Sequence, residues 1–180
     1  MNDAFSKRIQ SAIEWLQSEY AGIRTGQATP ALLDSIKVES YGAMMPINQV
    51  GSIGIEDART LRVSPWDAGA VATIERAIKD ADLGVSVATD SSGLRVIFPE
   101  LSSERRVQLV KLAKAKLEDA RVRIRAARDE AMKDIDAREK SGGMGEDQKF
   151  KEKDAVQKQV EAANKRLDDL YGTKEKEIAG

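Results

Sequence analysis

One long stretch with a helical repeat constrains this chain more than any other feature. From Val110 to Ile135, apolar residues recur at steps of three and four, which places them along one side of an α-helix. They are Val110, Ala113, Leu117, Ala120, Ile124, Ala127, Ala131 and Ile135. A helix from Ser103 to about Lys140 would be ~55 Å long. It cannot bury this apolar seam alone, so other helices of the chain must cover it.

Two further segments have the same period and predict the partner helices. Apolar residues at this spacing predict a first helix over residues 3–25, which Gly26 ends. A third helix follows a turn at residues 141–147 and carries Phe150, Val156, Val160, Ala163, Leu167 and Leu170 on one face. The three segments together predict an antiparallel bundle, with Ser102 or Ser103 as the N-cap of the long helix.

The segment from Pro30 to Ser102 has a different pattern. β-branched residues alternate or cluster between glycines and prolines, which predicts strands within residues 35–42, 45–55, 59–65 and 93–100. Between them, Val71, Ile74 and Ile78 predict one helix that ends at Gly84. A small α/β domain, residues 30–102, is therefore expected inside the first connection of a bundle domain, residues 1–29 and 103–180. The expected fold class is α+β.

Two short chain crossings join the predicted domains, at about residues 26–30 and 101–104. A double linkage of this kind predicts a hinge. Its candidate residues are Gly26, Thr29, Pro30, Leu101, Ser102 and Ser103. The Pro30 ring fixes its own φ and restricts Thr29, so bending is expected to be directional.

The composition excludes several kinds of chemistry. The chain has no Cys and no His, which excludes disulfides, thiolate catalysis and the commonest general base and metal ligand. Carboxylates, lysines and hydroxyls remain as possible reactive groups, so an enzyme is disfavoured but not forbidden. Our expectation is a chain with no catalytic residue, no metal site and no cofactor. The N-terminus lacks the apolar core of a signal peptide, and no apolar run reaches the ~18 residues of a membrane span. A cytoplasmic protein is expected.

Four arginines lie within eight residues of the predicted long helix, although the formal net charge of the chain is −1. Arg121, Arg125 and Arg128 are expected within ~60° of one another around the helix, beside the seam. One interpretation is a solvated face with Arg121–Glu118 and Arg125–Asp129 ion pairs. The other is a face that binds nucleic acid through its phosphates, because guanidinium groups match phosphate geometry.

Two other features allow alternative interpretations. Trp66 follows Pro65 in a predicted turn, where it either packs over the core of the small domain or forms an exposed contact. Met44 and Met45, beside Pro46, lie at a predicted loop tip, where they either fill the core or contact another protein.

Six motifs occur in a fixed order along the chain. They are IRTGQATPALLD at 23–34, VESYG at 38–42, ARTLRVSPWD at 58–67, IERAIKDADLG at 74–84, FPELSSERR at 98–106 and RVRIRAARDEAM at 121–132. Through them the chain resembles the bacterial ribosome recycling factor family over essentially its whole length. The resemblance implies an L-shaped molecule, in which a three-helix bundle and a β/α/β sandwich are joined by two hinge strands.

The resemblance also implies a function and partners. A family member, itself without a catalytic site, binds the post-termination 70S ribosome. With elongation factor G and GTP, it splits the ribosome into subunits and releases mRNA and tRNA. The expected partners are therefore the ribosome, its large-subunit ribosomal RNA and elongation factor G, with no small-molecule substrate. A monomer is expected, because the bundle seams can be covered within one chain.

Site residues follow from the same resemblance. Ribosomal RNA contacts map by motif to Arg24, Arg106, Arg125 and Arg128, with Arg105 and Arg121 at positions that are usually basic. Contacts with elongation factor G or the small subunit map to the loop that carries Tyr41, Met44, Met45 and Pro46. Gln27 and Asp129 stand where basic residues are usual in the family, so the grip on RNA is expected to be weaker or altered.

The residues favour neither of two other classes of protein. A chaperone-like scaffold would expose apolar helix tips and would not show salt-sensitive RNA binding. A metal-dependent hydrolase would need convergent carboxylates, but Asp57, Asp67 and Asp82 fall in separate segments.

Overall fold

The computed structural model describes residues 3–180, which form two compact units. The helical unit contains the described residues up to Tyr20 together with Lys111–Glu175. The mixed unit contains Ala21–Val110 together with Lys176–Gly180. The expected domain boundaries near residues 29 and 103, and all the expected hinge residues, therefore lie within the mixed unit.

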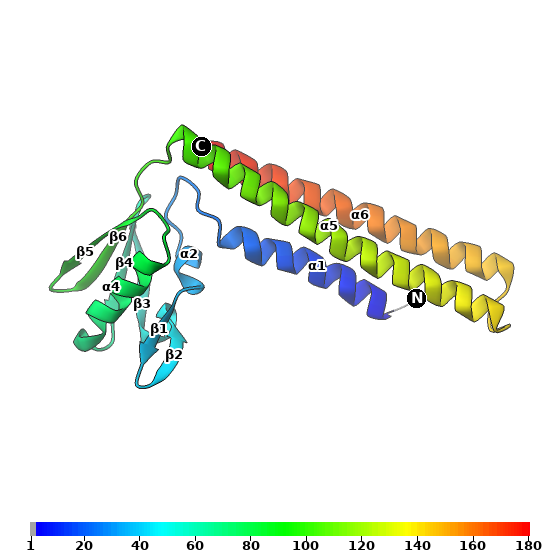
Figure 1. The fold of residues 1–180 in the computed structure, drawn as a ribbon, viewed down its shortest axis with the longest axis horizontal. Helices are drawn as coiled ribbons and strands as arrows, with labels where there is room; N and C mark the ends of the chain where they lie inside the picture. Colours follow the sequence, from blue (N-terminus) through cyan, green and yellow to red (C-terminus); the bar gives the residue numbers. More distant parts are fainter. Residues whose placement is uncertain (1–2) are drawn as a thin grey trace. The chain divides into compact units, whose positions relative to one another are not determined.

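The helical unit is made by α1 (Asp3–Ala21) and by the greater part of α5 (Ser103–Lys140) and α6 (Glu146–Ala179), which lie side by side (Figure 1). At the end of α1, the Tyr20 hydroxyl donates to the Ala113 carbonyl oxygen early in this part of α5, at 2.8 Å. Late in α5, Arg138 pairs with Glu152 early in α6. Both contacts require antiparallel neighbours, so the predicted bundle is confirmed.

The predicted apolar seams form the core of this bundle. Every predicted seam residue of α5 is buried except Val110, which is half-buried. On α6, the seam from Val156 to Leu167 is buried as predicted, but Phe150 is 75% exposed. The prediction for Phe150 was wrong because the six-residue step to Val156 turns a helix by ~240°, which takes Phe150 off the buried face.

Helix α1 ends at Ala21 and does not reach Thr25. Gly22 follows, and glycine is a poor helix former. The next two side chains, Ile23 and Arg24, are buried in the mixed unit. Leaving the helix here lets the Arg24 side chain reach the carbonyl oxygens of Gly84 and Pro99.

The mixed unit is built around a four-stranded antiparallel sheet with strand order β3-β4-β6-β5. Its strands are β3 (Gly51–Asp57), β4 (Thr60–Pro65), β5 (Ser86–Asp90) and β6 (Gly93–Ile97). Helix α4 (Val71–Asp80; Figure 1) contacts β5 and β6. Its residues Ile74 and Ile78 are completely buried. The helix predicted in this region is thus confirmed.

A second, two-stranded sheet pairs β1 (Lys37–Ser40) with β2 (Ala43–Pro46). Three short elements complete the unit: α2 (Ala31–Asp34), α3 (Ile47–Val50) and the 3-10 helix η1 (Ala68–Ala70). The single core of the unit draws residues from both sheets and from the helices, including Leu33, Val38, Ile47, Leu61, Ile74 and Phe98. The α+β class, a bundle together with a small α/β unit, is confirmed.

Two strand predictions need correction. Residues 45–55 do not form one strand, because α3 separates β2 from β3. Ile47 and Val50 are three residues apart and both buried, which a helical turn achieves and an alternating strand does not. Strand β5 was not predicted. It lies at the sheet edge, and its single large apolar residue, Val87, is half-buried, so alternation is weak there.

The buried Tyr20 gives a first prediction. Burial, together with the nearby Tyr171, raises the pKa of Tyr20 to about 12, against a smaller lowering by Arg121. Since this pKa exceeds the value near 10 of an unfolded tyrosine, the neutral hydroxyl contributes stability that is complete below about pH 10 and is lost as the pH rises towards 12. Titration of phenolate absorbance should include the ionisation of Tyr20 near pH 12.

The variant Tyr20→Phe should lack that ionisation. It should also lower the free energy of urea unfolding of the helical unit by about 0.5–1.5 kcal/mol, because the hydrogen bond to Ala113 is lost. Tyr41→Phe, at an exposed position, is the control. Because the hydrogen bond to Glu175 also raises the pKa of Tyr171, the comparison is of the amount of phenolate formed near pH 12, and an amount in Tyr20→Phe equal to that of the native chain would contradict the assignment.

Candidate nucleic-acid interface

The arginine stripe of α5 comprises Arg121, Arg125 and Arg128, all in the helical unit. Arg121 pairs with Glu118 one turn earlier and with Asp168 of α6. These hydrogen bonds, above all the one to Asp168, raise the pKa of Arg121, so its guanidinium stays charged. The pair with Asp168 also shows that the stripe borders the side of α5 that faces α6.

Arg125 differs from its two neighbours. Its side chain is exposed, and within residues 3–180 it makes no ion pair or hydrogen bond. The expected pair with Asp129 does not form, because Asp129 bonds to Arg128 at 2.9 Å. The expected Arg121–Glu118 pair does form. A ligand can therefore bind the Arg125 guanidinium without displacing a carboxylate.

The ion pairs of Arg121 and Arg128 do not prevent a ligand from binding to the arginine stripe. Their side chains are 32% and 36% exposed, and the Asp168 and Asp129 side chains more than half. Exposed ion pairs of this kind contribute only ~0–1 kcal/mol. A phosphate offers a guanidinium two parallel, charge-assisted hydrogen bonds in return. Phosphates can therefore replace these carboxylates at little cost.

A second cationic cluster lies on the side of α5 that faces α1. The Arg123 guanidinium carbon is 4.2 Å from the centroid of the Trp15 ring, and Lys116 Nζ is 5.8 Å from it. Lys116 also pairs with Glu19 at 3.0 Å. Cation–π contacts at such positions contribute ~0.5–1 kcal/mol, so this cluster helps to fasten α1 to α5. The sequence pattern does not reveal this cluster, because only the register of the two helices brings Trp15 to Arg123.

Arg24, predicted as an RNA contact, is buried in the mixed unit and only 6% exposed. Its guanidinium donates to the carbonyl oxygens of Gly84, at 3.0 Å, and of Pro99, and its central carbon lies 5.5 Å from the centroid of the Phe98 ring. Burial, with Arg105 nearby, lowers the pKa of Arg24. The side chain thus ties together three segments that are remote in sequence, and as placed it offers no surface to a ligand.

Arg105 and Arg106 lie in the first turn of α5, within the mixed unit. Arg105 is exposed, and its guanidinium donates to Gln108. Arg106 is half-buried and donates to the Ala179 carbonyl oxygen at 2.7 Å. The structure therefore divides the six predicted arginines equally between the two units, with Arg105 the most accessible in the mixed unit.

The predicted hinge residues carry local hydrogen bonds. The Thr29 and Pro30 carbonyls accept from the first turn of α2. Ser102 Oγ accepts from the backbone N–H of Arg105 at 3.1 Å, which identifies Ser102 as the N-cap of α5. The remaining positions are Gly26, next to open space, Leu101, which is buried, and Ser103, the first residue of α5.

The predicted protein-contact residues lie on the β1–β2 hairpin. Tyr41 is 93% exposed and Met44 62%, while Met45 and Pro46 are half-buried. Trp66 is 71% exposed, so the interpretation of this residue as part of the core was wrong. The aromatic residue that the core of the mixed unit does contain is Phe98, which is completely buried.

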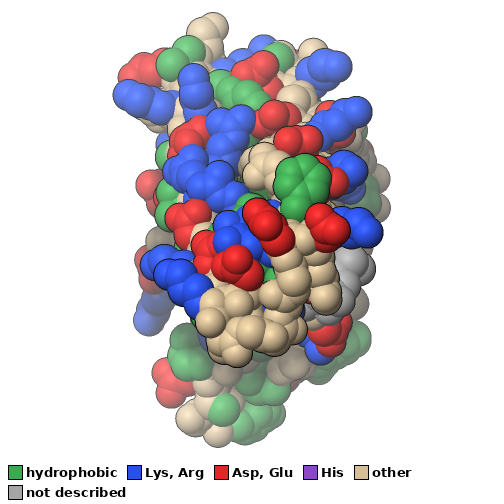
Figure 2. Space-filling view, turned by 90° about the vertical axis from the view of Figure 1, so that its right-hand side faces the viewer, with side chains coloured by type: hydrophobic (Ala, Val, Ile, Leu, Met, Phe, Trp, Pro, Cys, Tyr) green, Lys and Arg blue, Asp and Glu red, His purple; other side chains and the backbone are tan. Residues whose placement is uncertain are grey.

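Charges of both signs are interspersed on the face that Figure 2 shows. Among residues 3–180 there is no group of three or more His, Cys, Asp or Glu side chains arranged to hold a metal ion. None of the helices in that same range has the length and apolar composition needed to cross a membrane. The chemistry that the site offers is therefore hydrogen bonding and charge, exerted mainly by arginine.

Comparison with known proteins gives a consistent result. A sequence model of the family described as “Ribosome recycling factor” matches residues 16–179. The ribosome-recycling factor of Pelodictyon phaeoclathratiforme is 45% identical over 171 residues, which cover 95% of this chain and 92% of the relative. That of Gluconacetobacter diazotrophicus is 39% identical over 176 residues, covering 98% of this chain and 94% of the relative.

Solved structures agree. A solution structure of the ribosome recycling factor matches with a TM-score of 0.77 and 36% identity, covering 97% of this chain and 93% of the other. A second match has a TM-score of 0.68 and 37% identity, covering 98% and 96%. It belongs to models of the T. thermophilus ribosome recycling factor and the E. coli elongation factor G bound to the E. coli post-termination complex.

The buried Arg24 gives a second prediction. Arg24→Met keeps most of the apolar stem but leaves the Gly84 and Pro99 carbonyls without their donor. The free energy of unfolding of the mixed unit should fall by about 1–3 kcal/mol. Each unit contains one tryptophan, Trp15 or Trp66, so Trp66 fluorescence in a Trp15→Phe background reports on the mixed unit.

Arg105→Met is the matched control, because this arginine is exposed, and it should change the unfolding free energy by no more than about 0.5 kcal/mol. Equal effects of the two substitutions would refute a structural role for Arg24.

Proposed function

Because this chain belongs to the ribosome recycling factor family, we propose that it binds the post-termination ribosome and, with elongation factor G and GTP hydrolysis, separates it into subunits. The mRNA and tRNA then become free for another round of protein synthesis. The family match over residues 16–179 carries this proposal. The solved relative described with elongation factor G on a post-termination complex supports the same partners.

The α5 stripe is proposed to bind large-subunit ribosomal RNA through its phosphates. Arg125 binds without losing a partner, whereas Arg121 and Arg128 exchange carboxylates for phosphates. Arg105 and Arg106 are proposed as further RNA contacts from the mixed unit. Arg24 is proposed to act indirectly, by holding the chain segments around Gly84 and Pro99 in place.

The same proposal assigns roles to the parts of the chain. Residues 1–29 and 103–180 form the RNA-binding domain, and residues 30–102 form the domain that meets elongation factor G or the small subunit. The segments around 26–30 and 101–104 bend between them. The chain itself catalyses no reaction and needs no cofactor, which its lack of His and Cys favours. It acts as a monomer in the cytoplasm, where ribosomes are found.

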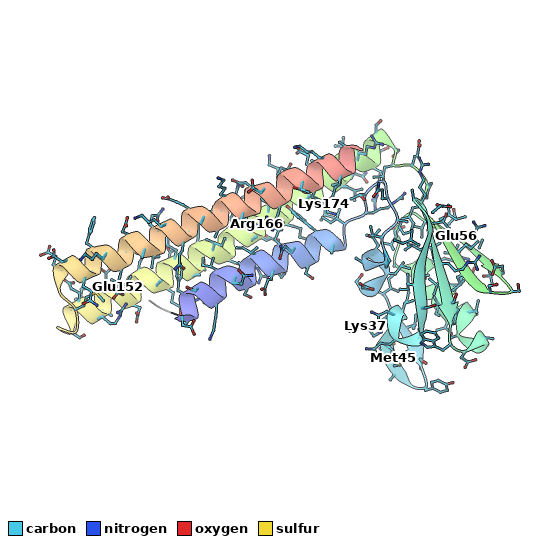
Figure 3. All side chains as sticks on the ribbon, turned by 180° about the vertical axis from the view of Figure 1, so that it is seen from behind. Lys37, Met45, Glu56, Glu152, Arg166 and Lys174 are labelled. Atoms are coloured by element: carbon cyan, nitrogen blue, oxygen red, sulfur yellow. The ribbon has the colours of Figure 1, made fainter. Side chains whose placement is uncertain are left out.

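RNA binding by Arg125 predicts a change in salt dependence. Arg125→Gln should weaken co-sedimentation with vacant large ribosomal subunits. The slope of log affinity against log salt should become shallower by about 1, the effect of one lost phosphate contact. Arg166→Gln is the matched control. Figure 3 labels Arg166 on α6. Its side chain is exposed, and a step of two residues places it ~160° around that helix from Asp168. Identical slopes for both variants and the native chain would refute the contact.

The neighbouring acid allows a test of opposite sign. Asp129→Asn removes the partner of Arg128, so binding should become tighter and its salt dependence steeper. Helical circular dichroism should be unchanged in all these variants, because each substituted side chain is largely exposed. A weaker complex with Asp129→Asn would count against phosphate binding by Arg128.

The proposed hinge depends on Pro30, which begins the turn into α2 with φ −55°. Pro30→Gly should slow subunit splitting by elongation factor G without reducing ribosome binding, because glycine no longer confines the direction of bending. The mixed unit should also lose about 0.4–1 kcal/mol of stability. The splitting rate of Pro30→Ala should lie between those of the native chain and Pro30→Gly. An unchanged splitting rate for Pro30→Gly would show that this residue does not direct the motion.

A further inference from the structure

A cleft of about 430 Å³ opens on the mixed unit beside the β1–β2 hairpin. Tyr41 and Trp66 both line it, with Met45, Glu39 and Asp67. Figure 3 labels Met45 on the hairpin. Tyr41, Trp66 and the adjacent Met44 are three large apolar side chains that the fold leaves exposed. Apolar residues gathered around a concave surface mark contact sites more often than isolated exposed ones do.

The backbone of Tyr41 is strained. Tyr41 and Gly42 form the two-residue turn between β1 and β2, and both have positive φ, at 51° and 79°. Turns of this type favour Asn or Gly at the first position, and a bulky residue there costs on the order of 1 kcal/mol or more. Burial does not offset this cost, because the Tyr41 side chain is 93% exposed. Stability of the turn alone would thus favour Asn or Gly at this position, yet the residue is a tyrosine with an exposed ring.

Polar contacts hold the two aromatic residues at the cleft. The Tyr41 hydroxyl donates to Asp67 Oδ2 at 3.1 Å, while Asp67 Oδ1 accepts from the backbone N–H of Gly69 at 2.9 Å. Trp66 is held through its backbone N–H, which donates to the Val50 carbonyl oxygen at 3.0 Å. The aromatic residues and the carboxylate are therefore part of one ordered arrangement.

The charges of the cleft select the chemistry of its ligand. Its charged lining residues within the described chain are the two acids, Glu39 and Asp67. Lys37, two residues before Glu39 on β1, does not line the cleft. Aromatic faces and carboxylates together attract guanidinium and ammonium groups, whereas the phosphates of RNA would meet two negative charges. The surface is therefore complementary to a basic protein segment and repels a nucleic acid.

We propose that this cleft receives an arginine or lysine side chain from a basic protein segment at the ribosomal binding site. The occupied cleft would lie between Tyr41 and Trp66, with the cation paired to Glu39 or Asp67. This inference rests on the proposed function for its biological setting, but the capture of a cationic side chain can be measured without ribosomes.

The first test uses blocked tetra-arginine and tetra-glutamate peptides and follows Trp66 fluorescence in the Trp15→Phe chain. Tetra-arginine should change the emission at low salt, and tetra-glutamate should not. The double variant Glu39→Gln, Asp67→Asn should lower the affinity for tetra-arginine about tenfold, as the loss of two exposed ion pairs implies. Asp90→Asn, which removes a carboxylate of β5, should have no effect. No response to tetra-arginine, or an equal response after Asp90→Asn and the double substitution, would overturn the proposal.

A second variant separates contact from folding. Asparagine tolerates positive φ, so Tyr41→Asn should leave the stability of the mixed unit unchanged or increased. It should nevertheless weaken tetra-arginine binding about fivefold, as the loss of one cation–π contact implies. A loss of stability with unchanged binding would show that Tyr41 serves the fold only.

The third test identifies the partner on the ribosome. Since the chain has no cysteine, Met44→Cys provides a single thiol for a benzophenone photocrosslinker, and Ala88→Cys, on β5, provides the control. Labelled protein that co-sediments with 70S ribosomes should crosslink from position 44 to Arg- or Lys-bearing peptides of a protein. Crosslinks to ribosomal RNA, or none, would overturn the inference while leaving the proposed function intact. Failure to co-sediment would count against the proposed function, and the peptide titration would then decide the inference.

Discussion

Burial of the alanine-rich seam of α5 is the constraint on which the helical unit depends. Alanine side chains end at Cβ, so helices that pack over Ala113, Ala120 and Ala127 can come near the α5 backbone. At the edges of this seam, Asp168 of α6 meets Arg121, and Trp15 of α1 meets Arg123. The core packing therefore determines which charged side chains meet at the edges of the seam.

The mixed unit uses a polar side chain for a comparable purpose. Arg24 follows the end of α1 in sequence, yet its guanidinium bonds to Gly84 and Pro99, which stand at opposite ends of the β5–β6 segment. A long side chain with several donors can satisfy separate carbonyl groups that no backbone N–H reaches. One arginine thus connects the entry of the chain into this unit with its exit towards α5.

The sequence predicted the features that depend on periodic burial. The seams of α1, α5 and α6 and the buried face of α4 follow from side-chain spacing alone, and the structure confirms them except at Phe150, which is exposed. The motif resemblance identified the family and six candidate RNA-binding arginines. It did not predict which of these arginines are buried, paired or without a partner. The burial of Arg24 depends on Gly84 and Pro99, and the freedom of Arg125 depends on Asp129 bonding to Arg128 instead, although helical spacing favours Arg125. Trp66 was misplaced because the direction of a turn residue is set by tertiary contacts, which a single sequence does not contain.

The acids that pair with Arg121 and Arg128 have a thermodynamic consequence. An RNA that takes over these guanidinium groups releases cations from its own atmosphere, but each displaced carboxylate then attracts a cation from solution. The net number of ions released is therefore smaller than the number of phosphates contacted. Acids built into the stripe would make the complex less sensitive to cellular potassium than its count of arginines suggests. They would also discourage binding to RNA that cannot reach several arginines at once.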